Sequence, residues 1–215
     1  MWDFLAAGGP FMALLVLTSV VSLTFIVERG IALRRSSVVP KSVEDAMENC
    51  HSKEHLDALQ ATCKKYPSAL ARLVLAAIDH LPWPKADNQN SLETRARHEV
   101  VNLERGLVIL EVIVGIAPLL GLVGTVHGLI TLFGSLGKSA LSDSAVLSKG
   151  IAIALNTTLM GLLIAIPSLI AWSYYTKKVE SLAVEMETLL DDLLRRQYRA
   201  KKGKSGTDDR GGSTE

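Results

Sequence analysis

Strong charge of either sign is missing from this sequence, and aromatic residues are scarce. The net charge is +1 at neutral pH, and Phe, Trp and Tyr together make up 5% of the 215 residues. Proteins that bind nucleic acids usually carry clustered basic residues, often interleaved with aromatic ones. The sequence has no such patch, so we do not expect it to bind nucleic acid.

Cysteine is also scarce, and its spacing does not predict a metal site. The two cysteines, Cys50 and Cys63, fall in a segment that we place in the cytosol below, where thiols stay reduced. His51 and His55 lie near them, on one side of an expected helix. Structural zinc sites pair their cysteines more closely. We therefore favour packed cysteines and solvated histidines over metal binding, and expect no cofactor.

Catalytic motifs and a cleavable leader are missing too. The sequence has no glycine-rich phosphate loop, nucleophile elbow or metalloprotease motif. It begins Met-Trp-Asp-Phe without basic residues, and the apolar stretch that follows has no small-residue cleavage site. We predict that the chain is not an enzyme and that its first apolar stretch is a retained membrane helix.

Long apolar runs are what the sequence does have. It is 48% hydrophobic and 21% charged, a mixture typical of membrane segments joined by charged soluble stretches. Residues 5–27, 107–133 and 151–175 form three apolar runs. Each is long enough to cross a bilayer as a helix, which takes about 20 residues. The pattern predicts an all-α integral membrane protein with three transmembrane helices.

The positions of lysine and arginine set the expected orientation. Basic residues gather after the first run, before the second and after the third, and none precedes the first. Because such residues stay on the cytosolic side, we expect the N-terminus outside and the C-terminus inside. The residues behind this assignment are Arg29, Arg34, Arg35, Lys41, Arg95, Arg97, Arg105, Lys177 and Lys178, against Lys138 and Lys149 between the last two runs.

Helix signals divide the chain further. Asn90 and Glu93 resemble a capping box, and Pro118 alone interrupts the helical pattern from there to position 134. Apolar residues also recur at helical spacing beyond Lys178. We therefore expect the second and third spans to extend into the cytosol as long helices. The expected segments are a periplasmic N-terminus with the first span (1–32), a cytosolic helical loop (33–89), a long helix with the second span (90–133), a short periplasmic loop (134–150), the third span with its cytosolic helix (151–199) and a disordered tail (200–215).

Small residues line one face of the second and third runs, and a threonine lies within each face. Such stripes let transmembrane helices approach closely. Thr125 and Thr158 either face a polar path or merely bond the carbonyl one turn back, and both interpretations stay open. The residues expected to pack the helices are Pro118, Gly121, Gly124, Gly128, Ala154, Gly161 and Ala165.

Glu111 is a third candidate for a polar path. It lies 14 residues before Thr125, at nearly the same helical phase and toward the cytosolic end of the span. A carboxylate there marks either the mouth of a path or an interfacial side chain that reaches water or pairs with Arg105.

Two motifs together resemble one family. Residues 117–129, APLLGLVGTVHGL, resemble the A-P-x-x-G-L-x-G-T-V-x-G signature of the ExbB/TolQ/MotA proton-channel family. Residues 150–167, GIAIALNTTLMGLLIAIP, resemble its second signature. The resemblance covers residues 90–195 well and the first span in layout only. Three spans match the ExbB/TolQ branch, because the MotA branch usually has four.

The resemblance implies a motor driven by the proton-motive force in the bacterial inner membrane. Five copies of the chain would surround two copies of a single-span partner similar to ExbD or TolR, whose membrane aspartate carries the proton. Thr125 and Thr158 would face that aspartate from the inner wall of the ring. Proton flow would then move the partner and do work across the envelope, with a TonB- or TolA-like protein as a further partner.

One position departs from the family pattern. Some relatives have a glutamate five residues before the threonine of the third span, where this chain has Ile153. No acidic residue then lies at mid-membrane, which fits a partner that supplies the proton-binding carboxylate. Asn156 and Thr157 are accessory polar residues off the Thr158 face. His127 carries an imidazole, which suits charge switching near neutral pH, but a packing or interfacial role is favoured.

Two other functions stay open. A structural membrane scaffold that assembles a complex through its long cytosolic helices would use the same small-residue stripes without conducting ions. A self-sufficient channel is less favoured, because the chain offers no ionised residue at mid-membrane. A neighbouring gene for a short single-span protein with a membrane aspartate would favour the motor.

Overall fold

The described part of the chain is helical throughout and divides into two units. The computed structural model describes residues 9–50, 53–136 and 144–208. Unit 1 comprises the described residues up to Gly30 together with Gly106–Thr176. Unit 2 comprises Ile31–Arg105 and the described residues from Lys177 onward. The long helix α9 (Ser144–Asp208) therefore supplies residues to both units.

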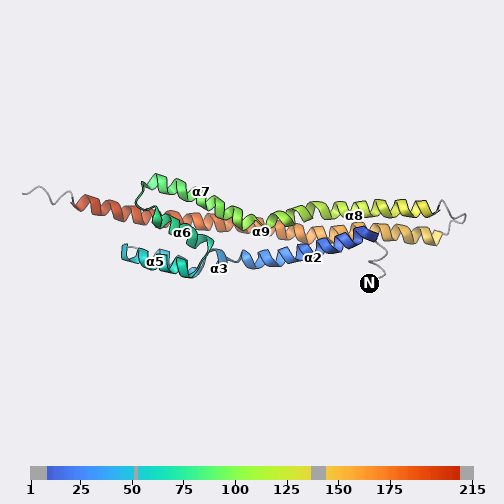
Figure 1. Ribbon diagram of the computed structural model, residues 1–215, viewed down its shortest axis with the longest axis horizontal. Helices are drawn as coiled ribbons and strands as arrows, with labels where there is room; N and C mark the ends of the chain where they lie inside the picture. The colour runs from blue at the N-terminus through green and yellow to red at the C-terminus, as the bar shows by residue number, and fades with distance from the viewer. Residues whose placement is uncertain (1–8, 51–52, 137–143, 209–215) are drawn as a thin grey trace, which may run out of the picture. The chain divides into compact units, whose positions relative to one another are not determined.

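Unit 1 is a bundle of three apolar helices. Helices α2 (Gly9–Ala32) and α8 (Leu107–Leu136) lie side by side with the first part of α9 (Figure 1). Within the described residues, these are the helices long and apolar enough to cross a membrane. Their shared core is small, and it consists of Leu15 from α2, Ile113 and Ala117 from α8, and Ile164 and Ala165 from α9.

Large apolar side chains of unit 1 point outward. Leu119, Ile130 and Ile170 are 60%, 66% and 65% exposed, whereas the core contacts of α8 and α9 involve small residues such as Ala117. A soluble bundle would leave far less apolar surface uncovered. The arrangement suits a hydrocarbon environment, where close packing of small residues rather than exclusion of water holds helices together.

Polar contacts also join α2 to α9 inside unit 1. The hydroxyls of Ser22 and Ser168 lie 2.6 Å apart and both residues are buried, while Ser168 also donates to the Ile164 carbonyl at 2.7 Å. The Tyr175 hydroxyl donates to the Ile26 carbonyl at 2.9 Å. Because apolar surroundings offer no competing water, these bonds fix the register of the two helices.

Unit 2 has a conventional apolar core built around α6. This helix (Ala69–Asp79) begins at Ser68, whose hydroxyl accepts from the Ala71 amide at 3.1 Å as an N-cap. Eight of its residues are buried, including Leu70, Leu73 and Val74. The surrounding helices are α3 (Arg35–Val38), α4 (Lys41–Glu48), α5 (Lys53–Lys65), α7 (Lys85–Glu104) and the C-terminal part of α9.

The C-terminal part of α9 also satisfies the ends of shorter helices. Arg196 donates to the Glu48 carbonyl and Gln197 to the Cys50 carbonyl, each at 3.0 Å. The Tyr198 hydroxyl donates to the Trp83 carbonyl at 2.9 Å. Carbonyls that end or follow a helix lack partners within it, so these side chains replace water there.

The single helix expected over residues 90–133 is corrected to two helices, α7 and α8. They are separated at Arg105 and Gly106. Glycine is a poor helix former, and a side chain at position 106 would collide with the Arg29 guanidinium. The expected capping box at Asn90 and Glu93 lies inside α7, which begins earlier because Pro84 ends the preceding segment in an extended conformation.

The other segment boundaries differ more modestly. The helix expected over 151–199 belongs to α9, which begins at Ser144 and ends at Asp208. The tail expected to be disordered from residue 200 is thus helical as far as Asp208, and residues 209–215 lie outside the described part. The loop expected at 134–150 contains the end of α8 and the start of α9, with 137–143 outside the described residues.

The two cysteines are free thiols in the core of unit 2. Cys50 and Cys63 are both buried, and His55 is exposed, while His51 lies outside the described residues. Burial raises the pKa of the Cys63 thiol to about 11. Burial also raises the pKa of Cys50, partly offset by the charge of Arg196.

The raised pKa of Cys63 predicts low reactivity. An ordinary cysteine is half ionised at about pH 8.5, whereas Cys63 stays a neutral thiol until the pH approaches about 11. Only the thiolate is nucleophilic. Iodoacetamide at about pH 8.5 should therefore label Cys63 in denatured but not in folded protein. Mass spectrometry of the labelled peptides measures the difference, and equal labelling of both forms would contradict the prediction.

Candidate functional site

The two threonines singled out by the sequence meet across the contact between α8 and α9. Their hydroxyls are hydrogen-bonded to each other. The Thr158 hydroxyl also reaches the Gly121 carbonyl of α8 at 3.1 Å. The Thr125 hydroxyl reaches the Ala154 carbonyl of α9 at 3.1 Å and the Gly121 carbonyl at 3.2 Å. Each threonine thus bonds a carbonyl of the opposite helix. Thr125 also bonds a carbonyl of its own helix.

This network contains more acceptors than protons. Each hydroxyl has one proton to donate and two lone pairs that accept. The carbonyls of Gly121 and Ala154 and the partner hydroxyl compete for only two protons. Whichever arrangement holds, lone pairs of the pair remain available to an outside donor. Both threonines are half-buried, so such a donor has a side from which to approach.

Glycines bring the two helices close enough for these bonds. A Cβ atom at Gly161 would lie 2.6 Å from the Ala117 carbonyl oxygen, and one at Gly121 would lie 3.0 Å from the Thr158 Cα. Neither position has room for a side chain. At Gly128 a Cβ would lie 3.1 Å from that of Ala154. The expected packing role of these small residues therefore corresponds to a direct contact of the two backbones.

The remaining residues singled out by the sequence lie around this contact. Thr157 is buried and donates to the Ile153 carbonyl at 3.4 Å, and its side chain packs against Gly124. Asn156 and Pro118 are half-buried, and Ala165 belongs to the core of unit 1. The ring of His127, an exposed residue, lies 5.4 Å from that of Phe11 on α2.

Glu111 is separate from the threonine pair. It is exposed on α8, next to Leu110, which is fully buried. Its position 14 residues before Thr125 corresponds to about 20 Å along a helix at 1.5 Å per residue. A direct hydrogen bond between the carboxylate and the threonines is therefore excluded.

Sequence reasoning missed Ser22, the buried partner of Ser168. The small-residue pattern in the sequence analysis covers the second and third runs only, and the first run is expected to be no more than a membrane span. The signal was available, because Ser22 is a small polar residue inside an apolar run. Such residues prefer helix interfaces in membranes.

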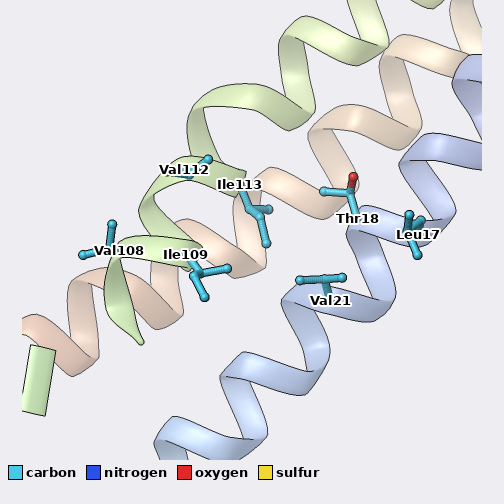
Figure 2. A pocket seen from close by; sticks show the side chains of 7 residues that line it. All are labelled: Leu17, Thr18, Val21, Val108, Ile109, Val112 and Ile113. Atoms are coloured by element: carbon cyan, nitrogen blue, oxygen red, sulfur yellow. The ribbon is translucent and has the colours of Figure 1, made fainter. Parts of the chain in front are cut away.

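A groove on the surface of unit 1 has a different character. Its volume is about 280 Å³. Figure 2 shows the side chains of α2 and α8 that line it. Its only polar side chain, Thr18, donates its proton to the Leu14 carbonyl at 2.9 Å. The groove therefore suits apolar contacts rather than an ion. It is lined by Leu17, Thr18, Val21, Val108, Ile109, Val112 and Ile113.

The close contact at Gly161 makes a stability prediction. Gly161→Ala places a methyl group against a backbone carbonyl, so we expect a loss of about 1–3 kcal/mol, as for other overpacked sites. Gly115→Ala is the matched control, because its Cβ would have no atom within 4 Å. Thermal unfolding of the purified chain in detergent measures both. An unchanged melting temperature for Gly161→Ala would contradict the close contact.

Comparison with known proteins places this site in a family. The family model described as the MotA/TolQ/ExbB proton channel family matches residues 65–188. The chain is 28% identical over 180 residues to a putative biopolymer transport protein ExbB homolog of Methanothermobacter thermautotrophicus, covering 83% of this chain and 63% of that one. It is 32% identical over 183 residues to the putative biopolymer transport protein ExbB-like 1 of Synechocystis sp., covering 79% and 68%.

A shorter match is to the biopolymer transport protein ExbB of Helicobacter pylori, at 39% identity over 83 residues, which cover 39% of this chain and 57% of that one. The family match at residues 65–188 includes both threonines and the glycines that pack around them. Since that match spans more than half of the 215 residues, the chain belongs to the MotA/TolQ/ExbB proton channel family.

Proposed function

We propose that this chain is the channel subunit of a motor driven by the proton-motive force in the bacterial inner membrane. It works with a single-span partner similar to ExbD or TolR and converts proton flow into mechanical work across the envelope. Five copies form a ring around the partner, with the N-terminus of each copy outside and the C-terminus inside. A TonB- or TolA-like protein that spans the periplasm receives the movement.

The observation that carries this proposal is the threonine pair without a carboxylate beside it. Thr125 and Thr158 offer hydroxyl oxygens at the helix contact of unit 1. The chain has no Asp or Glu between Val112 and Leu136 or between Ser144 and Thr176. Hydroxyls exchange hydrogen bonds readily but do not take up an additional proton at neutral pH. The carboxylate that carries the proton at the threonine pair therefore comes from another chain.

The threonine pair has the chemistry to serve a moving carboxyl group. When the partner's carboxylate arrives, a hydroxyl turns its proton from a carbonyl to the carboxylate. When the carboxyl group is protonated, the lone pairs of Thr125 or Thr158 accept from it. The pair thus stabilises both protonation states of the carboxyl group. The carbonyls of Gly121 and Ala154 accept the threonine protons whenever the carboxyl group does not. Because both states are stabilised, the carboxyl group can move past the threonines instead of binding there tightly.

Removing the hydroxyls tests this role. We expect Thr125→Ala and Thr158→Ala to assemble with the partner normally but to reduce proton flux by about tenfold or more, the scale of a lost proton-transfer group. Proton uptake into proteoliposomes that contain the complex measures this flux. Thr24→Ala is the matched control, because Thr24 is exposed on α2 and bonds only the Val20 carbonyl, at 2.8 Å.

Identification of the partner separates the motor from the alternative scaffold. Mass spectrometry of proteins that copurify with the full chain should find a short single-span protein with an aspartate in its apolar segment. If both threonine variants retain full proton flux, the role of the threonine pair is contradicted. If no such partner copurifies and no flux is observed, the chain is a non-conducting scaffold instead.

A further inference from the structure

A cavity of about 330 Å³ in unit 1 borders the threonine pair. All three helices of the unit contribute to its wall, which we call the His127 cavity. Small residues at the helix contact leave the space open. The residues that matter for its chemistry are Gly9 from α2, Gly128, His127 and Thr131 from α8, and Ala154 and Thr157 from α9.

The His127 cavity and the threonine pair share residues. Ala154 lines the cavity, and its carbonyl accepts from the Thr125 hydroxyl at 3.1 Å. Thr157, also in the wall, directly precedes Thr158. The cavity therefore borders residues that contact or directly adjoin the hydroxyls proposed to serve the proton path.

The polar groups of the wall suit water. The Thr131 hydroxyl donates to the His127 carbonyl at 2.9 Å, and the Thr157 hydroxyl donates to the Ile153 carbonyl at 3.4 Å. Both oxygens keep lone pairs that accept from a water molecule. A water takes up about 30 Å³ in the liquid, so the cavity has room for several.

His127 is the titratable side chain in the described wall of this cavity. The residues facing it are Phe11 and Gly9 from α2, and Ile153, Ala154 and Thr157 from α9, none of which changes charge. Imidazole is the side chain suited to taking up and releasing a proton near neutral pH. A histidine in a cavity wall that also carries two threonine hydroxyls is therefore placed to exchange protons with water that enters the cavity.

We propose that the His127 cavity is the hydrated chamber through which protons reach the threonine pair, and that His127 is its proton-accepting group. The inference rests on the proposed function. The imidazole takes a proton from hydronium and leaves water. The imidazolium then returns this proton through the cavity water to the partner's carboxylate at the threonine pair, and neutral imidazole is restored.

Packing against Phe11 is the competing explanation for His127. A ring-centroid distance of 5.4 Å and an interplanar angle of 59° are ordinary for an aromatic pair. His127→Phe keeps that contact and removes titration, whereas His127→Gln removes both. The two variants therefore separate the explanations.

Chemical modification tests the hydration of the cavity without relying on transport. Diethyl pyrocarbonate modifies neutral imidazole that water can reach. In the full chain in lipid nanodiscs, we expect His127 to be modified. The exposed His98 of α7 is the internal reference. Modification of His98 but not of His127 would overturn the proposal.

Proton flux tests the role of the imidazole. In proteoliposomes with the copurified partner, we expect His127→Gln and His127→Phe to slow flux by about a hundredfold, the lower end of general acid–base effects, and to flatten its dependence on outside pH. His98→Gln should match the unmodified chain. Full flux with an unchanged pH profile in either His127 variant would overturn the proposal.

Thr158→Ala shows which proposal has failed. If it abolishes flux while His127→Gln does not, the cavity proposal alone is overturned and the threonine path stands. If the unmodified complex carries no flux, both are overturned.

Discussion

The direct contact between the backbones of α8 and α9 is the constraint on which the rest of unit 1 depends. It requires residues without side chains at Gly121 and Gly161, because a Cβ atom at either would meet the opposite helix. The hydroxyls of Thr125 and Thr158 reach the carbonyls of the opposite helix only at this separation. The close approach of the helices and the polar network therefore depend on each other. In a membrane, no water is present to satisfy the polar groups if the helices move apart.

The sequence was sufficient for the apolar part of the fold and for the threonines, because both follow from periodicity. Small residues repeated at helical spacing placed Thr125 and Thr158 on packing faces, and the structure brings these faces together. Features that depend on a distant partner were not accessible. A side chain at position 106 would meet Arg29, and Ser22 is hydrogen-bonded to Ser168. The glycine and the serine can be read from the sequence, but their partners on other helices cannot.

The two units stabilise helices by different means. Unit 2 buries large aliphatic side chains such as Leu70, Leu73 and Leu193, as soluble domains do. Unit 1 has a small core in which alanine, serine and glycine lie beside a few large residues such as Leu15, and it exposes many other large apolar side chains. The family to which the chain belongs needs an ion-permeable membrane part. Small buried residues leave space beside polar groups there, which a tightly filled aliphatic core would not.

The side chains of α9 that cap the helices of unit 2 have a consequence for biosynthesis. Arg196, Gln197 and Tyr198 donate hydrogen bonds to carbonyls within residues 48–83. The ribosome must therefore add more than a hundred residues after position 83 before these bonds can form. Two membrane helices are translated in that interval. The faces of α4 and α6 that α9 covers stay exposed meanwhile, since contacts so distant in sequence form late. A chain truncated before α9 ends would leave a subunit inserted but unfinished.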